Sequence, residues 1–209
     1  PSLGLGSGNY SLAIDQAYTV ATDGIHVFDR KSDPSNPAPL TTLAANGPRA
    51  ITVLPNVVSG KADYLYVATG SAGLSIFDMT AGLPDSAASV VGDVDAVDVS
   101  RAARYLYVVA AGTGVNIYDN QNPAEASLVS TVDIPTAVRA VPWGIHLFVA
   151  AGQAGLVVVD ISDHSAPEIV GTLSGINAVA VRLYAHHQNG PAFAARAYVA
   201  DPDFGIRVV

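Results

Sequence analysis

Short apolar segments separated by turn-forming residues recur along the whole chain. A glycine followed by four apolar-rich positions and an aspartate occurs at Gly24, Gly73, Gly114 and Gly155, and a shortened copy starts at Gly205. The spacings between these glycines are 49, 41, 41 and 50 residues. The segments are rich in Val, Ile and Tyr and are bounded by Gly, Pro, Asn and Asp, which predicts strands joined by tight turns.

Each copy belongs to a group of four such segments. The first segments are 10–14, 50–54, 96–100, 137–141 and 178–182; the second are 17–21, 64–70, 105–112, 146–152 and 197–201; the fourth are 40–44, 88–92, 128–132 and 169–173. Helical periodicity of useful length is absent. A period of about 41 residues with four strands is typical of a β-propeller, in which each repeat forms one blade.

The sequence therefore predicts an all-β, single-domain β-propeller over residues 1–209. Its five four-stranded blades are expected at about 10–44, 50–92, 96–132, 137–173 and 178–209. The last group lacks a fourth segment, and residues 1–6 (PSLGLG) resemble the proline-led fourth segments of other groups. We expect this N-terminal strand to close the ring, because closure removes exposed sheet edges. The alternative is an excerpt from a propeller of six or seven blades.

The most regular repeat resembles a known family. It reads GLVVVDISDHSAP over residues 155–167, preceded by HLFVAAGQA and followed by EIVGTL. This stretch is similar to the LVIVD repeat family, and the other groups match it less closely. The resemblance implies a propeller from a bacterial or archaeal surface or extracellular protein, with the periplasm as an alternative. It supplies no catalytic residues. Because the chain starts at Pro1 without a signal-like segment, we expect it to be part of a longer polypeptide.

Composition narrows the possible partners. The chain has 10 basic and 18 acidic residues, a net charge of −8, which disfavours nucleic acid because phosphates would be repelled. No uncharged apolar run of 18 residues occurs, so we expect no membrane insertion. The chain contains no cysteine, which excludes disulfides and thiolate chemistry.

Residues that recur in every repeat are interpreted as structural. The repeated aspartates, Asp29, Asp78, Asp119 and Asp160, follow the third strand, where a carboxylate can accept backbone N–H bonds and hold the turn. The repeated glycines are expected to close tight hairpins, where positive φ or close packing is needed. An aromatic residue recurs in the second strand, which predicts packing between blades: Tyr18, Tyr66, Tyr107, Phe148 and Tyr198.

Two insertions interrupt the repeat, at 55–63 and at about 185–195, both between a first and a second strand. Equivalent hairpins project from one face of a propeller, so both are expected to flank blade one beside the proline-rich loop 32–39. This face is our candidate for binding a partner. Its candidate residues are Pro55, Asn56, Lys61, Asp63, His186, His187, Gln188, Asn189 and Phe193. The alternative is that both insertions are loops without a role, since insertions there cost little.

Metal and glycan signals are weak. His186 and His187 are adjacent in a predicted loop, and no third ligand is near in sequence. Asp201 and Asp203, like Asp93 and Asp95, alternate as carboxylates do in calcium loops, but neither pair continues into a full calcium-binding pattern. We therefore expect no cofactor, with calcium as the alternative. Asn9 begins the one glycosylation sequon of the chain.

Catalytic motifs are absent from the sequence. It has no G-x-S-x-G, H-E-x-x-H or phosphate-binding loop. The predicted innermost strands offer mainly Asp98, Arg139 and Arg182, which are too scattered for an acid–base pair. The sequence favours a non-catalytic structural or protein-interaction module, whose partner is a protein or a neighbouring domain. A hydrolase or lyase with a site at the channel mouth is the alternative, and a lectin-like module a weaker one.

Overall fold

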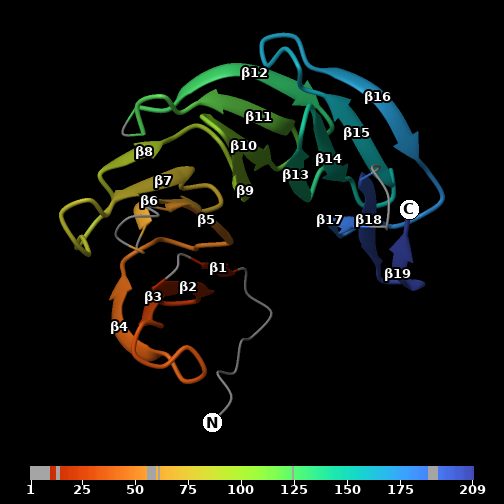
Figure 1. The fold of residues 1–209 in the computed structure, drawn as a ribbon. Coiled ribbons are helices and arrows are strands. Elements are labelled where there is room, and N and C mark those ends of the chain that lie inside the picture. Colours follow the sequence, from red (N-terminus) through yellow and green to blue (C-terminus); the bar gives the residue numbers. More distant parts are fainter. Residues whose placement is uncertain (1–9, 13–14, 56–59, 61, 124, 188–192) are drawn as a thin grey trace. The chain divides into compact units, whose positions relative to one another are not determined.

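The regular structure of the chain consists of strands that form five separate sheets (Figure 1). The structure is a computed structural model that describes residues 10–12, 15–55, 60, 62–123, 125–187 and 193–209. The described residues contain no α-helix. Consequently no helix in this part of the chain is long and apolar enough to cross a membrane.

Blades one and two lie in the N-terminal half. Blade one consists of β1 (Tyr10–Leu12), β2 (Gln16–Ala21), β3 (Gly24–Asp29) and β4 (Ala38–Leu43). Blade two consists of β5 (Ala50–Pro55), β6 (Ala62–Ala68), β7 (Leu74–Asp78) and β8 (Ser89–Val91). Within each sheet the strands lie side by side in chain order and pair antiparallel. Each sheet is therefore an antiparallel meander, which is the topology of a propeller blade.

Blades three to five continue the same pattern. Blade three is β9 (Ala96–Ala102), β10 (Tyr105–Ala110), β11 (Gly114–Asp119) and β12 (Ser127–Asp133). Blade four is β13 (Arg139–Trp143), β14 (His146–Ala150), β15 (Leu156–Asp160) and β16 (Glu168–Leu173). Blade five is β17 (Ala180–His187), β18 (Phe193–Asp201) and β19 (Gly205–Val208). The predicted all-β class and the five-bladed propeller architecture are confirmed, with three strands in place of four in the described part of blade five.

The chain divides into two compact units. Unit 1 contains residues up to 99 together with 120–127, and unit 2 contains 100–119 together with 128–209. Unit 1 has a core between blades one and two, with Tyr18 and Val27 packed against Leu65 and Phe77. Unit 2 has a core between blades four and five, where Leu156 packs with Val181 and Val199. Each fully buried aliphatic side chain contributes about 1.5–3 kcal/mol, so the contacts between neighbouring sheets stabilise both units.

The repeated glycine of each blade lies at the start of the third strand or one residue before it, and in blades one to four it lies against the backbone of the fourth strand. All five repeated glycines have positive φ, between 86° and 143°, as predicted. At Gly155 a Cβ atom would lie 2.0 Å from the carbonyl oxygen of Leu173 in β16. The backbones of β15 and β16 therefore approach so closely that a side chain is excluded at this position.

Three of the recurring tyrosines connect neighbouring blades, as predicted from their spacing. Tyr18, Tyr66 and Tyr107 are buried. Asn120, which follows β11 of blade three, donates through Nδ2 to the Tyr66 hydroxyl at 2.6 Å in unit 1. In unit 2 the Tyr107 hydroxyl lies 2.9 Å from Nε2 of His164, in the loop after β15 of blade four. Phe148 packs against the unit 2 core from a half-buried position, and Tyr198 is half-buried.

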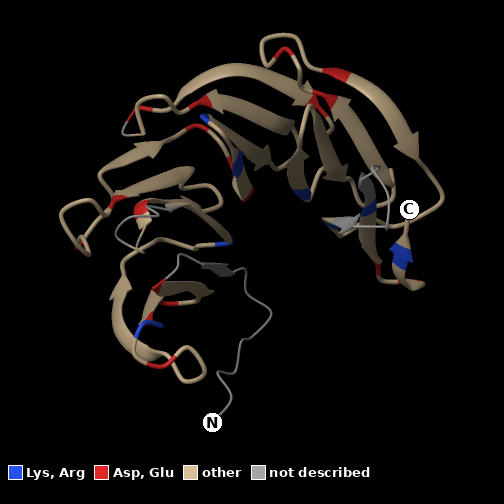
Figure 2. Cartoon of the chain, viewed as in Figure 1, with Lys and Arg blue, Asp and Glu red and all other residues tan. Residues whose placement is uncertain are grey.

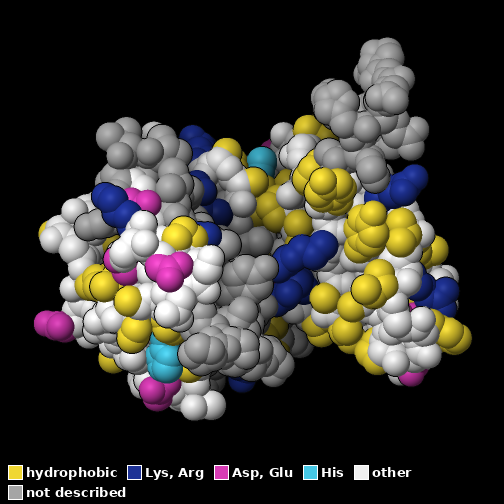
Figure 3. Space-filling view, turned by 60° about the horizontal axis from the view of Figure 1, so that its bottom comes forward, with side chains coloured by type: hydrophobic (Ala, Val, Ile, Leu, Met, Phe, Trp, Pro, Cys, Tyr) yellow, Lys and Arg dark blue, Asp and Glu magenta, His cyan; other side chains and the backbone are white. Residues whose placement is uncertain are grey.

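Blade five differs from the other four in having three strands among the described residues. Its strand β19 carries Ile206 and Val208, whose exposed fractions are 74% and 52%, and hydrophobic side chains are visible on this part of unit 2 in Figure 3. The predicted N-terminal closing strand, residues 1–6, lies outside the described residues. Closure of the ring by that strand stays a prediction.

The predicted loop at 185–195 is partly wrong. Strands β17 and β18 continue into it, and His186 pairs with Ala194 and His187 with Phe193 in the backbone register. The described residues at both ends of the insertion therefore extend the two strands of a β-hairpin, β17 and β18. The sequence missed this because AHHQNGPAFAA lacks the Val and Ile by which the other strands were recognised.

Candidate functional site

Three loops meet at Asp15, in the turn between β1 and β2. Its N–H donates to the carbonyl of Gly60 at 2.7 Å, and its carbonyl accepts the N–H of Arg30 at 2.8 Å. Gly60 belongs to the 55–63 insertion, and Arg30 begins the β3–β4 loop. At Gly60 φ is +73°, and a Cβ atom there would lie 2.4 Å from the Asp15 carboxylate. Glycine at position 60 thus lets the backbone of this residue lie directly against Asp15 of blade one.

The β3–β4 loop is held by its own aspartates. Asp29 accepts the N–H of Lys31 at 2.8 Å and the Ser32 hydroxyl at 2.9 Å. Asp33 accepts the N–H groups of Ser35 and Asn36 at 2.9 Å and 3.2 Å. Such turns restrict the loop without a regular strand or helix. Acidic side chains lie at strand ends and in loops of unit 1 (Figure 2), as Asp29 does at the end of β3.

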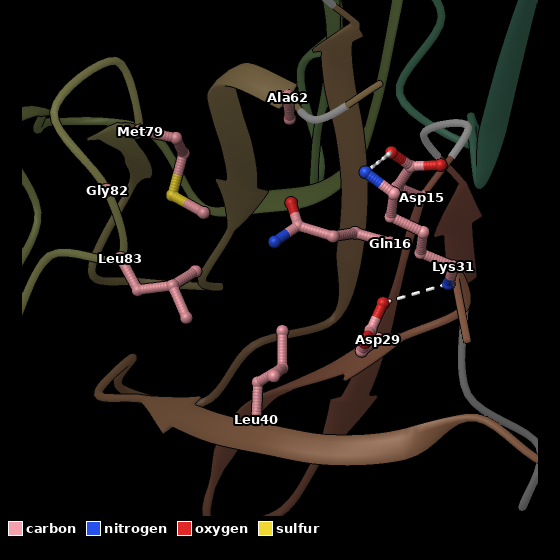
Figure 4. Close-up of a pocket in the computed structure, with 9 residues that line it drawn as sticks. All are labelled: Asp15, Gln16, Asp29, Lys31, Leu40, Ala62, Met79, Gly82 and Leu83. Carbon is pink, nitrogen blue, oxygen red and sulfur yellow. Dashed lines mark hydrogen bonds and ion pairs between the residues drawn. The ribbon is translucent and has the colours of Figure 1, made fainter. Parts of the chain in front are cut away.

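A pocket of about 440 Å³ opens beside this meeting point, within unit 1 (Figure 4). Polar groups from blade one form one side of it, and apolar groups, most of them from blade two, form the other. The polar side consists of Asp15, Gln16, Asp29 and Lys31; the apolar side consists of Leu40, Ala62, Met79 and Leu83, with Gly82 between the last two. Met79 is fixed by donating its N–H to the Asp63 carbonyl at 2.8 Å.

The polar wall carries two carboxylates and one ammonium group. Lys31 Nζ lies 4.0 Å from Asp15 Oδ2, which is an ion pair at its outer distance limit and not a hydrogen bond. The Lys31 side chain is 78% exposed and that of Asp15 is 23% exposed. Gln16 is buried, and its Oε1 accepts the Tyr18 hydroxyl. Burial raises the pKa of Tyr18 to about 12, so its hydroxyl remains a donor at neutral pH.

This combination of groups suits recognition of a ligand with a charged end and an apolar stem. The apolar wall is partly accessible, since Leu40 and Leu83 are 47% and 39% exposed. Figure 4 shows the Gln16 amide pointing into the pocket between the two walls. Carboxylates and an amide can bind charged or polar groups, while leucine and methionine side chains bury alkyl chains.

The predicted partner-binding residues are only partly described. Pro55 ends β5, and half-buried Asp63 lies in β6 next to the pocket. His186, His187 and Phe193 lie in the β17–β18 hairpin as backbone positions. The remaining candidates, Asn56, Lys61, Gln188 and Asn189, lie outside the described residues.

Two of the four aspartates considered as calcium ligands, Asp201 and Asp95, contact other side chains of the protein. Asp201 is buried and accepts the N–H of Asp203 at 3.0 Å and Arg207 Nε at 3.0 Å. These hydrogen bonds, together with the positive charge of Arg207, lower the pKa of Asp201 against the opposing effect of burial. Asp95 lies 3.5 Å from Arg49. Within the part of the chain that is described, no three His, Asp or Glu side chains are grouped as metal ligands.

Comparison with known families identifies the repeat. The sequence model of the LVIVD repeat matches residues 57–89 and 143–174. These stretches cover β6 and β7 of blade two and β14–β16 of blade four. The first stretch includes two pocket residues, Ala62 in β6 and Met79 directly after β7. The chain contains LVIVD repeats. No curated protein sequence matches it.

Solved structures resemble the LVIVD-repeat chain in fold. A protein from Lactobacillus plantarum superposes with a TM-score of 0.69 at 15% identity, over 96% of this chain and 69% of that one. A candidate 6-phosphogluconolactonase from Bacteroides uniformis superposes with a TM-score of 0.66 at 10% identity, over 96% of this chain and 69% of that one. BBS1N, solved in complex with ARL6DN, superposes with a TM-score of 0.67 at 14% identity, over 92% of this chain and 60% of that one. At these identities the likeness shows the fold alone.

The aspartate that ends the LVIVD pattern is confirmed as a turn residue in three repeats. Asp160 accepts the N–H of Ser162 at 2.8 Å, and Asp78 accepts the N–H of Thr80 at 2.9 Å, as Asp29 does from Lys31. Hydrogen bonds from these partners lower the pKa of Asp160 and Asp78. In the third repeat, a carboxylate oxygen of Asp119 forms an ion pair with the Arg104 guanidinium at 2.9 Å.

Two features of the structure were missed by sequence reasoning. The pocket residues Asp15, Lys31 and Leu83 carry no repeat signal, because they lie in loops that differ between blades. His164 lies in the polar run SDHSAP, and its ring stacks on Tyr105 at 3.6 Å between centroids, with 9° between the planes. The one sequence signal for this part of the interface was the recurring aromatic position at Tyr107, whose hydroxyl contacts the His164 ring.

Proposed function

We propose that this LVIVD-repeat propeller is a non-catalytic protein-interaction module of a secreted or cell-surface protein. The observation that carries the proposal is the pocket where the 55–63 insertion, the β1–β2 turn and the β3–β4 loop meet. Gly60 of the insertion accepts a backbone hydrogen bond from Asp15 of blade one, and a side chain at position 60 would collide with the Asp15 carboxylate. A loop without a role does not require such a specific contact. BBS1N, which shares the fold, is known in a complex with another protein.

The surface location rests on the resemblance to LVIVD-repeat proteins, which occur mainly on bacterial and archaeal surfaces. The acidic composition agrees with a module that meets other proteins rather than nucleic acid. The chain's partner is expected to be a protein or a neighbouring domain that contacts the loops of blades one and two. The predicted contribution of the 185–195 hairpin remains part of this proposal.

The proposal is tested by affinity capture from the cell-surface fraction of the source organism. The bait is compared with a double variant, Leu40→Glu with Leu83→Glu, which places charge on two partly exposed pocket residues. Val90→Glu is the control, because Val90 lies in β8 of blade two, is 56% exposed and does not line the pocket. We expect a specific protein to be retained by the wild type and by the control but lost by the double variant.

Retention of the same protein by the double variant would place the interaction elsewhere and remove the basis of the proposal. A circular-dichroism melt of each bait shows that the variants remain folded. A variant with residues 56–59 shortened to a tight turn repeats the test on the insertion itself.

A further inference from the structure

We infer that the pocket at Asp15 binds a basic side chain, arginine in particular, presented by an extended segment of a protein partner. This inference rests on the proposed interaction function and specifies what the pocket recognises. It depends on the charges of the polar wall, on the apolar wall opposite and on a second cavity that shares the lining residue Leu40 with the pocket.

The Asp15 carboxylate is positioned by the backbone rather than by its ion pair. Hydrogen bonds of the Asp15 main chain to Gly60 and Arg30 hold the residue, and the Gly60 backbone packs against its carboxylate. The Lys31 ammonium is 4.0 Å away on a largely exposed side chain, and surface ion pairs of this kind are weak. An incoming guanidinium can therefore displace Lys31 and form two parallel hydrogen bonds with the carboxylate.

The size and the second wall fit the rest of an arginine side chain. The pocket volume of about 440 Å³ exceeds what a single methyl or hydroxyl group would fill. Leu40, Met79 and Leu83 stand across from the carboxylates in Figure 4, so the alkyl stem can pack on them while its charged end reaches Asp15. The two carboxylates outnumber the single ammonium of the lining, and the chain has a net charge of −8.

A neighbouring cavity indicates that the occupant is longer than one side chain. A cavity of about 430 Å³ runs along β3 and β4, lined by His26, Phe28 and Pro39 among others, and it shares Leu40 with the pocket. Outer strand β4 is exposed at every position from Ala38 to Thr42. An extended peptide can thus continue from the pocket along blade one, as in peptide recognition at sheet edges.

The single methionine of the chain provides a direct probe, because Met79 lines the pocket. Protein labelled with ¹³C in the methionine methyl group gives one NMR signal from this site. The ligand is a blocked pentapeptide of alanine and valine with one central arginine. Matched peptides carry citrulline, which has the same shape without the charge, or glutamate at the centre.

We expect the arginine peptide to shift the Met79 signal saturably and to bind about tenfold more tightly than the citrulline peptide, as one charge-assisted contact predicts. Asp15→Asn should remove most of that preference. Lys31→Met should instead increase affinity for the arginine peptide, because it removes the competing cation while keeping an alkyl chain. This variant changes an exposed side chain, so its folding is not in question.

Equal shifts with arginine and citrulline would overturn the inference and leave an apolar pocket. Tighter binding of the glutamate peptide than of the arginine peptide would make Lys31 the recognition group and overturn the inference. Weaker binding of the arginine peptide to Lys31→Met would overturn it as well. Absence of any shift overturns it as well. The proposed function fails separately, when the capture experiment with Leu40→Glu and Leu83→Glu shows no loss of partner.

Discussion

Substitution of Gly155 by alanine should destabilise the protein far more than the same substitution at Gly144. Both glycines lie in turns of blade four and both have positive φ, 93° and 59°. At Gly144 a Cβ atom would meet nothing within 4 Å, whereas at Gly155 it would lie 2.0 Å from the Leu173 carbonyl oxygen. The pair separates the energy of the backbone conformation from that of the close approach between β15 and β16.

The expected magnitudes follow from these two environments. An alanine at positive φ is strained by about 1–2 kcal/mol, which is the whole effect expected for Gly144→Ala. Gly155→Ala must also move β16 away from β15, with loss of one or two backbone hydrogen bonds at about 1 kcal/mol each. We expect a total of about 3 kcal/mol for it. In a chain of this size, each kcal/mol lowers Tm by about 2–4 °C.

Thermal unfolding followed by circular dichroism tests the difference. Gly144→Ala should lower Tm by about 2–8 °C and Gly155→Ala by about 6–12 °C. Hydrogen exchange adds a local readout, because amides of β16 should exchange faster only in Gly155→Ala. Equal losses of Tm, with unchanged exchange in β16, would refute the close approach as the reason for the repeated glycine.

Three further predictions concern links between repeats. Burial lowers the pKa of His164 below its ordinary value, although the Asp163 carboxylate opposes this. The folded state therefore favours the neutral imidazole. The contribution of His164 to the free energy of unfolding is complete above about pH 6.5 and is lost as the pH falls below that value. Urea unfolding at pH 7.5 and 5.5 should show this loss, and His164→Gln should remove it, whereas a drop that persists in the variant would assign it to other groups. Tyr66→Phe should reduce the free energy of unfolding by about 1–3 kcal/mol, because it leaves the buried Asn120 amide without its acceptor; a cycle with Asn120→Ala that shows strictly additive losses would contradict the coupling. Deletion of residues 1–6 should lower Tm and promote aggregation if this segment is the predicted closing strand, and an unchanged melt with unchanged light scattering would argue against closure.

Strands and turns could be predicted because their causes are local. The positive φ at each repeated glycine is local, and so are the hydrogen bonds of the aspartate that closes the third strand, as Asp160 shows with Ser162. The spacing of about 41 residues then predicted blades, and the structure has five sheets at those positions. The hairpin at 180–201 was missed in part because pairing extended strands through residues of low strand propensity.

The pocket could not be predicted from the sequence, because its walls come from strands and loops that only the fold brings together. Asp15 is distant in sequence from Gly60 and Met79, and no pattern in the sequence around Asp15 predicts that these residues lie near it. The same holds for His164, which meets Tyr107 from 57 positions away. The sequence alone determined the repeat, the blades and their turns, since these depend on periodicity and short-range hydrogen bonds. The packing of blade two on blade one decided which carboxylates face which apolar side chains, because burial and charge in a pocket depend on all the elements around it.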